Sequence, residues 1–154
     1  MPEPLTAVID STVLISAFLT KGGVSDELLR YAREGVFVVC LSEEILIETE
    51  HTLSYPRLRT RYTYTDEDVT DFFDRLRLAA EFITDLPSLT GIVRDPNDDM
   101  IIATAERAQA AYIVTRDKDL LSLEMYEAIT ILTPEAFIAI LREYLRRRNQ
   151  EPTS

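Results

Sequence analysis

Acidic residues follow two apolar runs of this chain at the points where those runs end. Asp10 follows the run Leu5–Ile9, and Asp117 and Asp119 follow the run Tyr112–Thr115. Such runs are typical of buried parallel strands, and α/β sheets bind ligands at the carboxyl ends of their strands. Crowded carboxylates repel one another unless a cation lies between them, and oxygen ligands suit Mg²⁺ or Mn²⁺. We therefore expect a divalent metal site at this edge of the sheet.

Two further acidic positions could complete the site, and each leaves a choice. Asp98 and Asp99 begin a predicted helix, where adjacent residues differ by about a hundred degrees in direction. Asp99 is the better candidate because small alanines continue its face and allow close packing. Earlier in the chain, Glu44, Glu48 and His51 share one helix face, since residues three and four apart are neighbours. Spacing alone does not choose between the two glutamates.

Other chemistries fit these residues poorly. His51 is the only histidine, so a Ser or Cys nucleophile would have little choice of base, and zinc sites built on Cys and His are excluded. A di-iron bundle would need the Glu-x-x-His motif twice, and a phosphate-binding loop would need a glycine-rich stretch. A phosphotransfer domain with an aspartyl nucleophile would need Asp at position 12, which is Thr12 here. A response-regulator receiver would need an acidic pair before Asp10.

The elements that must position these acids alternate along the chain. Apolar runs at 5–9, 36–41, 112–114 and 128–132 predict strands, and helical spacing dominates between them. The longest helix begins at the capping-box sequence Thr65-x-x-Asp68 and keeps its spacing through Ile83. Strands separated by helices predict an α/β fold, a single-domain three-layer α/β/α sandwich with a central parallel sheet of four to five strands.

Length and composition agree with one soluble domain. The 154 residues are 46% hydrophobic and 28% charged, with no apolar run long enough for a membrane span and no basic leader. We expect a domain over residues 1–148, a disordered tail over 149–154, a cytoplasmic location and a buried structural thiol at Cys40. The net charge of -11 argues against nonspecific coating of nucleic acid, although arginines cluster at 57–61 and 142–148.

Four segments, in order, resemble the motifs of one known family. VIDSTVLISAFL is similar to the opening strand and turn of PIN domains, and LSEEILIETEHTLSYPRL to their second-helix segment. RDPNDDMIIATA is similar to the helix that carries their third acid, and IVTRDKDLL to the turn that carries their fourth. The resemblance extends from about Leu5 to Leu141, and it is closest to bacterial VapC-like ribonucleases, the toxin components of type II toxin–antitoxin pairs. It implies a parallel sheet between helices and a Mg²⁺- or Mn²⁺-dependent endoribonuclease.

The resemblance also assigns roles to individual residues. It implies that four acids bind metal and are catalytic: Asp10, Glu48, Asp99 and Asp117. The choice on the helix face thereby falls on Glu48 over Glu44. The expected supporting residues are Thr12, Thr115 and Asp119, and the expected substrate-binding residues are Arg116, Lys118, Arg57 and Arg59. The implied partners are an RNA substrate, an antitoxin protein and a second copy in a homodimer, with no membrane involved.

One departure from the family pattern sustains an alternative. PIN domains usually carry Asn two residues after the first Asp, and this chain has Thr12. Thr can donate and accept a hydrogen bond, but it is shorter, so Asp10 would be positioned less firmly. The alternative is therefore a weakly active or inert PIN scaffold that acts as a protein- or RNA-binding module.

Overall fold

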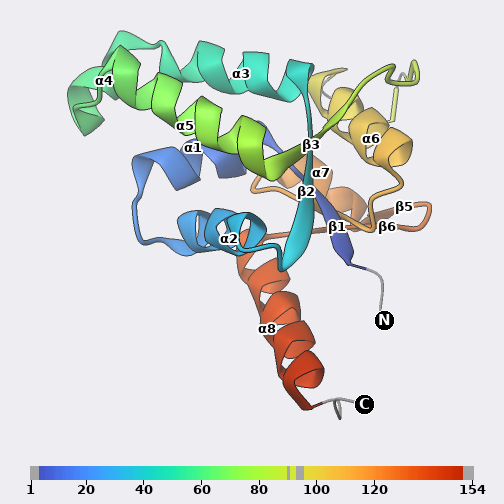
Figure 1. Cartoon of the computed structure of the whole chain (residues 1–154). Coiled ribbons are helices and arrows are strands. Elements are labelled where there is room, and N and C mark those ends of the chain that lie inside the picture. Colours follow the sequence, from blue (N-terminus) through green and yellow to red (C-terminus); the bar gives the residue numbers. More distant parts are fainter. Residues whose placement is uncertain (1–3, 90, 93–95, 151–154) are drawn as a thin grey trace.

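A six-stranded, mostly parallel sheet organises the chain in the computed structural model, which describes residues 4–89, 91–92 and 96–150 (Figure 1). Its elements follow in the order β1 (Leu5–Ile9), α1 (Ser11–Leu19), α2 (Val24–Arg33), β2 (Phe37–Ser42), α3 (Glu43–Leu53), α4 (Pro56–Tyr62), α5 (Asp66–Ala79), β3 (Ala80–Ile83), α6 (Pro96–Ala108), β4 (Tyr112–Val114), α7 (Lys118–Leu123), β5 (Met125–Tyr126), β6 (Ile129–Leu132) and α8 (Pro134–Gln150). Among the described residues, no helix has the length and apolar character of a membrane span.

The strand order places a topological switch point beside β1. The order across the sheet is β3-β2-β1-β4-β6-β5, so the chain moves from β1 to one side and returns to β4 on the other. All pairs are parallel except β5 with β6. Loops leaving two strands at such a reversal separate and open a crevice at their carboxyl ends. The residues after β1 and β4 therefore face a natural binding site.

Helices cover both faces of the sheet. Phe137 of α8 packs edge to face on Phe37 of β2, with ring centroids 5.1 Å apart, and lies beside Tyr112 of β4. On the alternate face, the Ser42 hydroxyl accepts a hydrogen bond of 3.1 Å from Thr104 of α6. Successive strand residues point to opposite faces, and Phe37 and Ser42 are five positions apart. Helices α6 and α8 therefore lie on opposite sides, which confirms the three-layer α/β/α class.

Local sequence signals act where they were expected. The Thr65 hydroxyl accepts from the Asp68 N–H at 3.1 Å, and the Asp68 carboxylate accepts from the Thr65 N–H at 2.9 Å. Helix α2 ends before Gly35, whose φ of +77° suits a residue without a Cβ. The single thiol, Cys40, is buried. The capping box and the buried thiol are thus confirmed.

Three features differ from the sequence expectation. The long helix was expected through Ile83, but α5 ends at Ala79 and the next four residues form β3. Those residues keep helical spacing, so only their pairing with β2 reveals a strand. The two-residue β5 gave no periodic signal, and together these strands raise the count to six. Helix α8 includes positions 149–150 of the expected tail, and 151–154 lie outside the described residues.

Candidate metal centre

Asp10 lies at the switch point, directly after β1. It is 3% exposed and is the N-cap of α1, where its Oδ1 accepts from the Val13 N–H at 3.3 Å. Its own N–H donates to the Val114 carbonyl at 3.2 Å, which ties the end of β1 to the end of β4. The same side chain therefore begins a helix and faces the crevice between two strands.

Burial controls the charge of Asp10. The pKa of the Asp10 carboxyl is raised from 3.8 to about 6, chiefly by removal from water and to a smaller extent by the nearby charge of Glu48. Hydrogen bonds from Thr115, Thr12 and Val13 oppose this rise. Glu48 is half-buried on α3, whereas Glu44 is exposed. The electrostatic coupling to Asp10 supports the choice of Glu48 on this helix face.

Two threonine hydroxyls join Asp10 to the turn after β4. The Thr12 hydroxyl donates to Asp10 Oδ1 at 2.5 Å and accepts from the Arg116 N–H at 3.1 Å. The Thr115 hydroxyl donates to Asp10 Oδ2 and accepts from the Asp117 N–H at 2.9 Å. Thr12 is shorter than the usual Asn, yet its hydroxyl reaches both partners. The network fixes the first acid relative to the turn that carries the last ones.

A compact group of three carboxylates lies in the same region. Oxygen atoms of Asp98, Asp117 and Asp119 all lie within 4.8 Å of one another, and all three side chains are partly exposed. Asp117 is the N-cap of α7, with Oδ2 accepting from the Leu120 N–H at 3.1 Å. Three oxygen donors from Asp side chains fit Mg²⁺ or Mn²⁺, which take carboxylates and keep several waters. These residues therefore have the chemistry to hold a divalent cation.

The structure brings the expected acids together only in part. Asp117 belongs to the compact group, and Asp119, expected in support, belongs to it as well. Asp99 is 6% exposed, and its Oδ2 accepts from the Gly91 N–H at 3.1 Å. Among the described residues, no group this compact combines Asp10, Glu48 and Asp99.

The sequence favours Asp99 over Asp98, because adjacent residues at a helix start point in different directions and only one of them can face Asp10 easily. Asp98 instead faces a second pair of acids, because the Asp117-x-Asp119 turn lies across from the first turn of α6. Adjacent residues on that turn can serve two neighbouring sets of ligands. Asp98 is therefore the acid to add to the expected set.

The expected substrate-binding residues have different surroundings. The Arg116 guanidinium donates to both Glu135 oxygens of α8, at 2.7 and 3.3 Å, and holds the pKa of Glu135 below its usual value. Arg59 pairs with Asp66. Lys118 and Arg57 are exposed, and neither has an ion pair within the part of the chain that the structure describes. Of the four, these two therefore carry exposed charges without a carboxylate partner among the described residues.

Solved structures and a protein family model are similar to this chain. The fold is similar to that of PAE2754 from Pyrobaculum aerophilum, at a TM-score of 0.58 and 13% identity, covering 90% of this chain and 90% of that one. It is also similar to the crystal structure of VapBC2 from Rickettsia felis bound to a DNA fragment from their promoter. The TM-score is 0.55 and the sequence identity 13%, and the match covers 84% of this chain and 98% of that one. No curated protein matches significantly. A model of the PIN domain matches residues 6–119, and the chain therefore belongs to the PIN domain family, a family of nucleases.

Proposed function

We propose that this protein is a metal-dependent endoribonuclease and the cytoplasmic toxin of a type II toxin–antitoxin pair. The observation that carries the nuclease proposal is the carboxylate group of Asp98, Asp117 and Asp119, joined through Thr115 to the buried Asp10 at the switch point. Repulsion among carboxylates this close is relieved by a cation. Membership of the PIN domain family makes phosphodiester cleavage the matching chemistry.

Five acidic residues have a part in this mechanism. A bound Mg²⁺ or Mn²⁺ would lower the pKa of a water molecule and neutralise charge at the phosphate. Asp98, Asp117 and Asp119 are the residues that would hold it, with Asp10 and Glu48 beside them. A carboxyl with a pKa of about 6 can hold or release a proton near neutral pH, so the Asp10–Glu48 pair is suited to accept the proton of the attacking water.

Two residues would orient the substrate. Lys118 follows Asp117 directly, and its exposed ammonium can attract a phosphate next to the carboxylates. Arg57 is exposed on α4 and could contact a more distant phosphate. Arg116 is held by Glu135, so its role is to fix the turn between Thr115 and Asp117. The net charge of -11 favours a local contact with a single strand over coating of a duplex.

The partners are proposed from likeness and from exposed apolar surface. VapBC2 is similar in fold, and an antitoxin that binds this chain would complete an analogous pair. Ile47 of α3 is 59% exposed and Leu78 of α5 is 89% exposed. A second copy of the chain that covered these side chains would remove apolar surface from water. Light scattering on the purified protein tests the homodimer, and a molecular mass of one chain at all concentrations would reject it.

Cleavage of end-labelled RNA tests the nuclease proposal. The purified chain should cut a single-stranded RNA in Mn²⁺, should stop in chelator, and should leave DNA of the same sequence intact. Asp117→Asn should be inactive, and Asp74→Asn, an exposed acid on α5, should remain fully active. Cleavage by Asp117→Asn at the wild-type rate would reject the assignment, because the activity would then come from elsewhere.

The inert scaffold remains the second candidate, and the surface of the protein is what favours it. An excess of acids over bases weakens any contact with RNA. The presence of Thr12 in place of the usual Asn is a weaker argument for the scaffold, because the Thr12 hydroxyl still forms two hydrogen bonds. Binding of Mn²⁺ without cleavage of any RNA would support the scaffold.

A further inference from the structure

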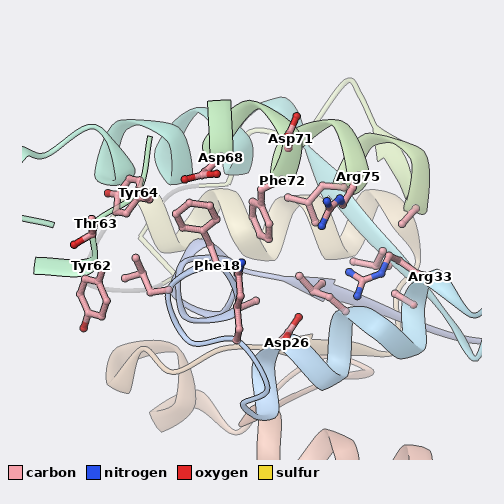
Figure 2. Close-up of a pocket in the computed structure, with 18 residues that line it drawn as sticks. Phe18, Asp26, Arg33, Tyr62, Thr63, Tyr64, Asp68, Asp71, Phe72 and Arg75 are labelled. Atoms are coloured by element: carbon pink, nitrogen blue, oxygen red, sulfur yellow. The ribbon is translucent and has the colours of Figure 1, made fainter. Parts of the chain in front are cut away.

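A cavity of about 660 Å³ lies between α1, α2 and α5, away from the carboxylates of the candidate metal centre (Figure 2). It is lined from α1 by Ala17, Phe18 and Leu19, the last residues of that helix. Asp10 precedes the other end of α1, which has 9 residues. At about 1.5 Å per residue the helix separates the two places by roughly 13 Å. The cavity is therefore a second site, independent of the proposed nuclease centre.

Aromatic side chains gather at one end of the cavity, with Thr63 and Asp68 beside them (Figure 2). The Phe18 ring packs edge to face on Tyr64 and Phe72, with ring centroids 4.9 and 5.2 Å away. Buried Leu29 and Leu76 continue the wall from α2 and α5. Its volume is within the roughly 300–1,000 Å³ usual for small-molecule sites, and polar and apolar side chains share its walls. The walls thus suit the body of an aromatic or aliphatic ligand.

The other end is cationic. Arg33 of α2 and Arg75 of α5 line the cavity, and Figure 2 shows their guanidiniums on opposite sides of the same end. Neither forms an ion pair or a side-chain hydrogen bond within the described residues, although acids outnumber bases in this chain. Other arginines also lack an ion pair among the described residues, for example Arg57 and Arg107, so what distinguishes Arg33 and Arg75 is that both lie at one end of the cavity.

None of the three acids that line the cavity forms an ion pair with Arg33 or Arg75 among the described residues. Asp26 accepts a hydrogen bond from the Gly22 N–H at 2.8 Å, and Asp68 is engaged in the capping box with Thr65. Asp71 is turned away from the two guanidiniums in Figure 2. Arg33 and Arg75 are both exposed, and two like charges at one end of a cavity repel each other less when an anion lies between them. An arginine fork binds a carboxylate, sulfonate or phosphate well because it offers parallel donors.

We propose that this cavity binds an amphipathic organic anion, with its acidic group between Arg33 and Arg75 and its apolar body against Phe18 and Phe72. The anion supplies the negatively charged partner that the two guanidiniums lack among the described residues, and the aromatic side chains shield the apolar body from water. This binding site shares no residue with the candidate metal centre, so ligand binding here can be tested independently of RNA cleavage.

Anilinonaphthalene sulfonate is a suitable probe because it joins an aromatic body to one anionic group and fluoresces when it leaves water. Fluorescence and calorimetric titration of the full chain should show one probe per chain. The uncharged N-phenylnaphthylamine has nearly the same body and should bind about tenfold more weakly, as loss of a charge-assisted hydrogen bond implies. Arg33→Gln and Arg75→Gln should each weaken the sulfonate about tenfold and leave the neutral probe unchanged.

Arg107→Gln is the matched control, since Arg107 on α6 also lacks an ion pair among the described residues but does not line the cavity. It should bind the sulfonate as the wild type does. Circular dichroism confirms that each variant is folded. Equal sulfonate affinity in wild type and the Arg33→Gln/Arg75→Gln double variant would overturn the proposal, and so would equal affinity for the charged and the neutral probe.

Discussion

Asp10 combines burial with hydrogen bonds from hydroxyls and a backbone N–H, and the causes of its pKa shift include no cation. Its pKa of about 6 in the folded chain exceeds the ordinary value of 3.8, so the folded state binds the proton more tightly than the unfolded state does. Stability of the metal-free protein therefore falls as pH rises from about 4 to about 6. A charged Asp10 costs the fold about 3 kcal/mol at neutral pH.

Asp10→Asn should therefore abolish RNA cleavage and stabilise the metal-free protein. The amide oxygen can still accept from Thr12 and Val13, but no charge is buried. Urea unfolding in chelator at pH 7 should show a gain of up to about 3 kcal/mol, which disappears near pH 3, where Asp10 is protonated in both states. A less stable variant at pH 7 would contradict the role given to burial.

Thr12 tests whether a hydroxyl can replace the amide usual at this position. Thr12→Val has nearly the same shape but loses the hydrogen bonds to Asp10 and to the Arg116 N–H. We expect RNA cleavage to fall about tenfold, the value of one or two lost hydrogen bonds. Thr12→Ser keeps the hydroxyl and should stay near the wild-type rate. Equal rates in the Val and Ser variants would show that the hydroxyl has no positioning role.

At the scale of elements, an ion pair joins helix α8 to the turn between β4 and α7. Arg116 lies between Thr115 and Asp117, and its guanidinium is held by Glu135 in the first turn of α8. Its backbone N–H is bound by Thr12 at the same time. Helix α8 therefore fixes a turn that carries part of the candidate metal centre, although α8 contributes no acid to it.

Glu135→Gln should weaken this link without removing a metal ligand. Because the pair is exposed, we expect only a few-fold loss of Mn²⁺ affinity and an unchanged fold. The matched control is Glu143→Gln, since the Glu143 carboxylate pairs with Arg146 and Arg147 of α8 itself. Calorimetric titration with Mn²⁺ measures both variants. An equal effect of the two substitutions would mean that the α8 link does not reach the centre.

The same elements show how far sequence alone could go. Strands β1, β2, β4 and β6 were predictable because their apolar runs are continuous, whereas β3 was hidden because its spacing continues that of α5. Asp10 and Asp117 could be placed because each follows a strand. Asp98 could not be chosen over Asp99 from the sequence. Its role follows from its proximity to Asp117 and Asp119, and that proximity depends on how two distant segments pack.

At the scale of the whole molecule, negative charge is in excess, and metal binding would reduce it locally. The net charge of -11 repels RNA at long range, while Lys118 lies next to the carboxylates. With few phosphates contacted, affinity for RNA should depend only weakly on salt. Contact with the substrate is therefore expected to depend on the occupied metal centre.

Calorimetric titration of the full chain with Mn²⁺ tests the central claim most directly, because it needs no knowledge of the RNA target. The wild type and Asp74→Asn should bind Mn²⁺ alike, and Asp117→Asn should bind it at least about tenfold more weakly, since one charged oxygen ligand is lost. Equal Mn²⁺ affinity in the wild type and Asp117→Asn, or no binding by any of the three, would contradict the claim that these carboxylates hold a cation.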